Sequence, residues 1–163
     1  MDWSKMFNSR VVVFGCGNTL YGDDALGPRV IQALQEKGGL GKDVALIDAG
    51  TSIRALLFDL ILSDQHPERV IIVDSSTDGE VPPGEIREID IHEVDPKKIA
   101  DFSMHQFPTT NLLKELQEST DVELNILVVQ AGFIPEKMQE ILSPEVEQAM
   151  GAVLQKVESL AGS

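Results

Sequence analysis

The sequence predicts a three-layer α/β/α sandwich around a mostly parallel sheet of about five strands, with one antiparallel edge strand. Short apolar, β-branched runs alternate along the chain with segments whose apolar residues recur at helical spacing. No repeat, low-complexity tract or long linker divides the 163 residues, of which 42% are hydrophobic. A chain of this length can bury one sizeable core. We therefore expect a single domain spanning residues 1–163.

Four apolar runs are expected to form the parallel strands. They are residues 11–14, 44–47, 70–73 and 124–129, which end near Gly15, Asp48, Asp74 and Gln130. Runs this apolar are typical of strands buried on both faces. The segment "VPPGEIREIDI", residues 81–91, differs because it follows the third run too closely for a helical crossover. Its Pro-Pro-Gly turn predicts a short hairpin-like return and an antiparallel strand at the sheet edge.

Helical segments lie between these runs. The first is expected to begin between Asp24 and Pro28, since proline is tolerated in a first turn, and to end at Gly38-Gly39. The others are expected over residues 52–62, residues 109–118, and from Ser143 through Leu160. In the last one, Ser-Pro-Glu gives a start signal and an apolar stripe runs at helical spacing.

Charge and cysteine content exclude several classes of partner. The net charge is −14, from 27 acidic and 13 basic residues, and such a surface repels nucleic acid and anionic lipid. No apolar run approaches the length of a membrane span, and residues 1–10 lack the apolar core of a signal peptide. The single cysteine, Cys16, cannot form an internal disulfide. We therefore expect a cytoplasmic protein.

The stretch "FGCGNTLYGDDALGPRV", residues 14–30, has two interpretations. A glycine-rich turn between a strand and a helix is typical of phosphate binding. However, Asp23 and Asp24 bring negative charge to the place that a phosphate would occupy, and Leu20 stands where the dinucleotide fingerprint needs its closing glycine. A nucleotide-binding module therefore remains the weaker alternative to a metal site.

Acidic residues are expected to meet at one edge of the sheet. Ligands of open α/β sheets bind at the carboxyl ends of the strands, where Asp48 and Asp74 are expected and where the Asp23-Asp24 pair follows by one loop, so that four carboxylates can converge. His105, in the loop "DFSMHQFPTT", can reach the same edge. One imidazole with two carboxylates suits a divalent transition metal that keeps open positions for water or substrate.

Each of these residues also has a structural interpretation. Asp48 can equally be a turn residue that accepts loop N–H groups. Asp23 is expected to cap the helix that follows it. His105 taken alone would be an ordinary core or surface histidine, and Cys16 is expected to be a buried thiol rather than a nucleophile.

An ordered set of motifs resembles a known family. The blocks "GCGNTLYGDDALGPRV", "DAGTSIRALL", "VIIVDSS" followed by "PPGEI", and "SMHQFPTTNLLKEL" are similar to those of the hydrogenase maturation endopeptidases. These nickel-dependent proteases trim the C-terminal extension from the large subunit of [NiFe] hydrogenases. The resemblance implies a HybD-like fold. It also implies metal ligands at Asp24, Asp74 and His105, with Asp48 as the aspartate of the Asp-x-Gly-Thr block.

Two departures from the family pattern concern the substrate. Ser75 follows Asp74 where the family commonly has alanine, and "QAGFIPEKM" replaces its usual Gln-Pro after the last strand. Both changes lie near the expected substrate groove. The altered block and the "GCGN" start are most similar to the branch that processes deazaflavin-reducing hydrogenases of methanogens.

The resemblance implies a mechanism. Nickel would arrive bound to the cysteines of the large-subunit precursor, and the two aspartates and His105 would complete its coordination, with other divalent metals able to substitute. Asp48 would then be a general base or an orienting group. A non-catalytic nickel-binding maturation factor is the alternative that uses the same residues.

Overall fold

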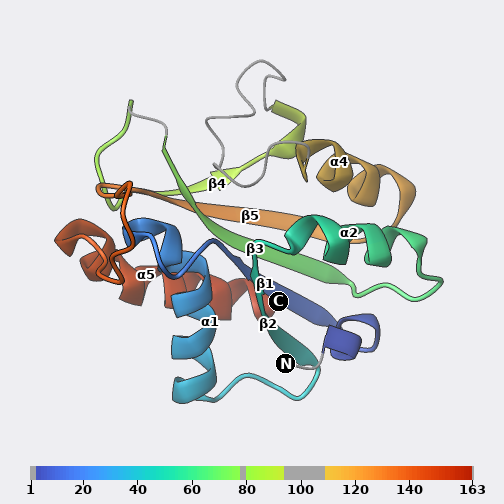
Figure 1. The fold of residues 1–163 in the computed structure, drawn as a ribbon. Coiled ribbons are helices and arrows are strands. Elements are labelled where there is room, and N and C mark those ends of the chain that lie inside the picture. Colours follow the sequence, from blue (N-terminus) through green and yellow to red (C-terminus); the bar gives the residue numbers. More distant parts are fainter. Residues whose placement is uncertain (1–2, 78–79, 94–108, 163) are drawn as a thin grey trace.

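The protein is built on a five-stranded sheet with the strand order β2-β1-β3-β5-β4. The computed structural model describes residues 3–77, 80–93 and 109–162, shown in Figure 1. The strands are β1 (Val11–Cys16), β2 (Val44–Gly50), β3 (Arg69–Ser76), β4 (Ile86–Ile89) and β5 (Glu123–Gln130). β4 is antiparallel to β5 and lies at the edge, whereas the other pairs are parallel. The predicted fold class is thus confirmed.

The edge strand has a different neighbour from the one expected. β4 pairs with β5, so the predicted hairpin-like return onto β3 is wrong. β3 instead pairs with β5 along its full length, from Arg69 opposite Glu123 to Ser76 opposite Gln130. This ladder is twice as long as the one that the four residues of β4 can form. The buried β3 therefore takes the longer strand as its neighbour, and the short, half-exposed β4 is left at the edge.

Helices cover both faces of the sheet (Figure 1). One face carries α1 (Leu26–Lys37) and α5 (Pro144–Ala161), and the other carries α2 (Ile53–Leu62) and α4 (Thr109–Ser119). Short 3-10 helices cover Trp3–Phe7 (η1), Gly22–Ala25 (η2) and Ile91–Glu93 (η3). These bounds confirm the predicted helices to within about two residues, apart from the 3-10 turn that precedes α1.

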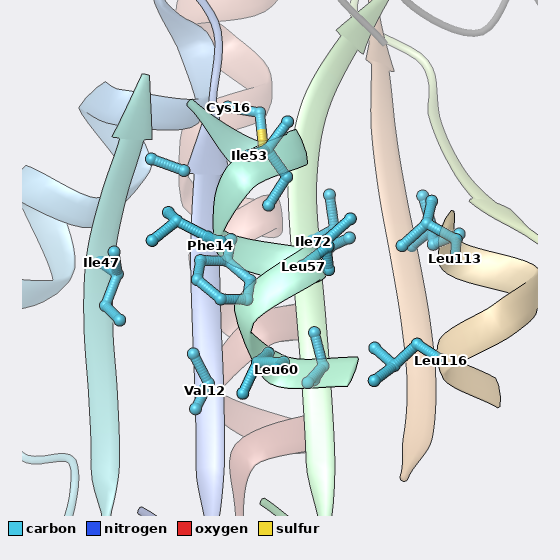
Figure 2. Close-up of a cluster of buried hydrophobic side chains, with 14 of the residues drawn as sticks. Val12, Phe14, Cys16, Ile47, Ile53, Leu57, Leu60, Ile72, Leu113 and Leu116 are labelled. Atoms are coloured by element: carbon cyan, nitrogen blue, oxygen red, sulfur yellow. The ribbon is translucent and has the colours of Figure 1, made fainter. Parts of the chain in front are cut away.

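Each face of the sheet has its own apolar core. Successive strand residues point to opposite faces, so Phe14 and Ile72 pack under α2 and α4 while Val13 and Val73 pack against α1 and α5. Figure 2 shows the first of these clusters, in which Leu57 and other α2 residues lie over the strands beside Leu113 and Leu116 of α4. Within the described ranges, no helix combines the length and apolar character that crossing a bilayer requires.

Two glycines bring α1 directly against the carboxyl end of β1. A Cβ atom placed on Gly15 would lie 2.2 Å from the Gly27 carbonyl oxygen, and one on Gly27 would lie 2.2 Å from the Cys16 carbonyl oxygen. Side chains at these positions would force the helix away from the strand. This close packing holds the intervening loop, including η2, against the carboxyl ends of the strands.

Candidate functional site

Two predicted ligands, Asp24 and Asp74, lie at the carboxyl end of the sheet. Asp74 is near the end of β3 and is fully buried, and Asp24 lies in η2 and is 2% exposed. η2 contacts β3 directly. Asp74 lies on the sheet face covered by α2 and α4, because its paired neighbour Val128 belongs to that core cluster. The fold therefore gathers two buried carboxylates at one edge.

Backbone amides orient both carboxylates. The Asn18 N–H donates to Oδ2 of Asp24 over 3.0 Å, and the Ser75 N–H donates to Oδ1 of Asp74 over 2.8 Å. Gly17 allows the loop to approach Asp24, because its φ is 133° and a Cβ there would lie 1.9 Å from the Asp24 carbonyl oxygen. Carboxylates fixed in this way have the orientation that metal ligands receive from surrounding hydrogen bonds.

The same geometry argues against a phosphate site. A phosphate-binding loop needs backbone N–H groups that point at an anion. Here the Asn18 N–H is bonded to a carboxylate of the protein itself, and Gly15 and Gly27 serve the packing of α1 on β1. The glycines of this loop are therefore explained without a nucleotide.

Asp48 lies on the other side of the sheet from Asp74. Its neighbours on the same face of β2, Val44 and Leu46, pack with the core cluster under α1 and α5. The half-buried Asp48 lines a cleft of about 470 Å³, together with residues of α1 such as Arg29. Its Oδ1 accepts the Gly50 N–H over 3.0 Å, as in the predicted turn interpretation. The sheet thus separates Asp48 from the face that carries Asp74.

Asp23 does not cap a helix, contrary to the expectation. Neither η2 nor α1 has a side-chain cap hydrogen bond. The fully buried Asp23 carboxylate instead accepts four hydrogen bonds from a distant loop. The donors are Gly132 N at 2.8 Å and Phe133 N, Ser143 N and Ser143 Oγ, each at 2.7 Å. These hydrogen bonds join the segment between β5 and α5 to the segment between β1 and α1. They also compensate the burial of the carboxylate, which would be costly without donors.

The third predicted ligand, His105, lies outside the described residues. Among the residues that are described, no group of three or more His, Cys, Asp or Glu side chains is arranged to hold a metal. Cys16 is a buried cysteine that forms no disulfide within the described residues, as expected, and lies beside Ile53 under α2 (Figure 2). The described part of the site thus consists of the two aspartates.

The fold and the site together define a class of protein. It is an α/β/α domain whose carboxyl edge carries oriented acids in place of a phosphate-binding loop. Residues 28–160 match the family model described as hydrogenase maturation protease, and the chain belongs to that family.

Relatives match over most of this chain. The delta subunit of coenzyme F420 hydrogenase from Methanothermobacter thermautotrophicus is 35% identical, over 92% of this chain and 88% of its own length. The hydrogenase 2 maturation protease of Escherichia coli is 29% identical, over 91% and 88%. The structure of the [NiFe] hydrogenase maturation protease HybD from Thermococcus kodakarensis superposes with a TM-score of 0.71 and 27% identity, covering 93% of this chain and 99% of that one.

Proposed function

We propose that this protein is an endopeptidase that removes the C-terminal extension of a nickel-loaded [NiFe] hydrogenase large-subunit precursor. Membership of the hydrogenase maturation protease family supports the protease activity. The observation that carries the nickel-dependent part is the pair of buried carboxylates, Asp24 and Asp74, at one edge of the sheet.

Nickel is proposed to arrive as part of the substrate. Asp24, Asp74 and His105 form an incomplete set of oxygen and nitrogen donors, which suits a divalent transition metal that keeps other ligands. Thiolates of the precursor would supply those other ligands. Recognition of the loaded metal would then restrict cleavage to precursors that have already received nickel.

Asp24, Asp74 and His105 would hold the docked metal, which would fix the scissile bond near the acids and would supply Lewis-acid activation of its carbonyl or of a water molecule. Asp48 faces the α1 side of the sheet, so we assign it an orienting role toward the substrate chain rather than proton transfer at the metal. Asp24 and Asp74 act as ligands whose positions are set by the amides of Asn18 and Ser75.

The proposed substrate is the large subunit of a deazaflavin-reducing hydrogenase. The 35% identity to a protein named as the delta subunit of coenzyme F420 hydrogenase supports this choice. A single cysteine, Cys16, cannot form an internal disulfide, which is consistent with a reducing compartment, and we place the reaction in the cytoplasm.

The decisive experiment compares nickel-loaded and nickel-free precursor. The protein is incubated with each, and loss of the C-terminal tail is followed by mass spectrometry. We expect cleavage of the loaded form alone, and its loss in the variant His105→Ala. His92→Ala is the matched control, because His92 is an exposed histidine in η3. Equal cleavage of both precursors would remove the nickel requirement, and normal cleavage by His105→Ala would remove that residue from the site.

A non-catalytic maturation factor is the second candidate. It is favoured by one observation, namely that a 35% identical relative is named as a hydrogenase subunit. Such a factor would bind the nickel-loaded precursor through the same residues and leave its length unchanged. The cleavage assay therefore separates the two functions.

A further inference from the structure

Exposed apolar side chains gather on two loops next to the candidate site. Seven large hydrophobic residues are exposed in the described part of the chain, and four of them lie in residues 20–22 and 132–141. They are Leu20 at 38%, Phe133 at 37%, Met138 at 66% and Ile141 at 71% exposure. We call these two segments, with the four side chains, the platform. Scattered apolar residues on a surface are ordinary, whereas a cluster of them indicates an interaction site.

Backbone hydrogen bonds join the two segments of the platform. Tyr21 and Gln139 form a parallel bridge, in which the Gln139 N–H donates to the Leu20 carbonyl and the Gly22 N–H donates to the Gln139 carbonyl, each over 2.7 Å. The bridge places Leu20 beside Met138. Gly22 permits this approach, since its φ is 53° and a Cβ there would lie 2.7 Å from the Phe133 carbonyl oxygen.

Hydrogen bonds to the buried carboxylate of Asp23 fix the longer segment of the platform. The four hydrogen bonds anchor both ends of the segment between β5 and α5, at Gly132 and at Ser143. Leu142, only 6% exposed, inserts into the core beneath α1 and α5 while its neighbour Ile141 points outward. The apolar surface is therefore held in one shape before any partner binds, which lowers the entropic cost of association.

The platform shares its first segment, residues 20–22, with the loop that leads to Asp24. Asp24 follows Asp23 in η2, and its carboxylate accepts the N–H of Asn18, two residues before Leu20. A protein that presents a metal to Asp24 must therefore lie against this loop. Figure 1 shows the segment between β5 and α5 beside the segment between β1 and η2, at the end of the sheet where β1 ends.

We propose that the platform is the docking surface for an apolar patch on the body of the large-subunit precursor, next to the segment that is cleaved. This inference rests on the proposed function. Exposed charges at Glu136, Lys137 and Glu140 border the apolar side chains, which gives the apolar centre and polar rim of a protein interface. A second copy of this chain is the less suitable occupant, because both copies would carry a net charge of −14.

The test compares two double variants of exposed apolar residues. Met138→Ser with Ile141→Ser removes the most exposed part of the platform, and Phe58→Ser with Leu62→Ser removes 52% and 67% exposed side chains from α2. Both pairs change surface residues, so both proteins are expected to fold. We expect the platform pair to weaken binding of the nickel-loaded precursor about 10- to 100-fold, whereas the α2 pair changes it less than about twofold.

Kinetics give a second readout. The platform pair is expected to raise KM for the full precursor and leave kcat unchanged, because neither altered side chain is a proposed metal ligand. Equal weakening by both pairs, or no weakening by the platform pair, would overturn the proposal. So would a wild-type dimer, seen by analytical ultracentrifugation, that the platform pair dissociates, since the occupant would then be a second copy.

Failure of the proposed function is distinguishable from failure of the platform. A wild-type protein that binds the precursor without cutting it refutes the protease function, while the binding comparison still tests the platform. A platform variant that binds and processes the precursor like the wild type refutes the platform alone.

Discussion

The charged side chains at the two ends of the parallel sheet differ in their exposure to solvent. At the amino end, Arg10 pairs with Asp43 over 2.6 Å and Arg69 pairs with Glu123 over 2.7 Å, with at least one partner of each pair largely exposed. At the carboxyl end, the carboxylates of Asp23, Asp24 and Asp74 are buried and accept N–H groups of the backbone. Charge is thus solvated at one end and enclosed at the other.

The exposed charges at the amino end and the buried charges at the carboxyl end differ in what they cost the folded protein. Exposed ion pairs contribute little to stability, because water and salt screen them and because long side chains lose freedom. Buried carboxylates are costly unless hydrogen bonds compensate them. At the carboxyl end, hydrogen bonds to Asp23 hold the loop between β5 and α5, and Asp24 and Asp74 are the residues that we propose as metal ligands.

The largest effect is expected from Asp74→Asn. The substitution keeps the shape of the side chain and removes the charge of a proposed ligand, so cleavage of nickel-loaded precursor should fall at least about 100-fold. The rate is measured by mass spectrometry of the released tail. Asp43→Asn, the same change at the amino end, serves as the control and should cleave normally. A decrease of only a few-fold in Asp74→Asn would remove this residue from the metal site.

Asp23→Ala is expected to cause the largest loss of stability. It leaves the N–H groups of Gly132, Phe133 and Ser143 without their buried acceptor, so the free energy of unfolding should fall by about 3–5 kcal/mol. Urea denaturation measures the change. Ser143→Ala removes a single hydrogen bond from a hydroxyl to this carboxylate and should cost about 1.5–3 kcal/mol. Equal, small effects of both variants would show that the carboxylate does not hold the loop.

The fold was predictable because its signals are local. Apolar runs such as Val70–Val73 and the Ser143-Pro144 start of α5 specify their elements within a few residues of sequence. The neighbour of β4 was not predictable in this way. β3 can pair with the long β5 or with the short β4, and it pairs with β5, so β4 lies on the other side of β5. The proximity of β4 to β3 in sequence does not reveal this outcome.

The site was predictable only in part. The positions of Asp24 and Asp74 follow from the rule that loops after parallel strands meet at one edge. The role of Asp23 depends on partners more than a hundred residues away, at Gly132 and Ser143, and only an adjacent pair of acids hinted at it. The expected strand end placed Asp48 at the carboxyl edge but did not say on which face of the sheet its side chain lies. The alternation of side chains along β2 places it on the α1 face.

Gly27→Ala tests whether the carboxyl end depends on backbone packing. The added Cβ would lie 2.2 Å from the Cys16 carbonyl oxygen and 2.7 Å from that of Val73, so α1 must shift away from β1 and β3. We expect a loss of about 3 kcal/mol in the free energy of unfolding. Gly151→Ala in α5 is the control, because its added Cβ would meet no described atom within 4 Å outside its own stretch of helix, and it should stabilise the protein by about 0.5–1 kcal/mol. Similar losses in both variants would contradict the close approach at Gly27.

The smallest effect is expected at the amino end, from Asp43→Asn. The hydrogen bond from the Arg10 side chain holds the pKa of the exposed Asp43 carboxyl below its ordinary value of 3.8. Because the pKa of Asp43 is lowered in the folded state, the pair stabilises the protein at pH values above the ordinary pKa. This contribution disappears as the pH falls through the lowered pKa of the folded state. The variant should therefore have a slightly lower urea midpoint than the wild type near neutral pH, and the difference should vanish in acid and shrink in high salt. A difference that is large, or that persists in acid, would show that the amino end uses its charges as the carboxyl end does.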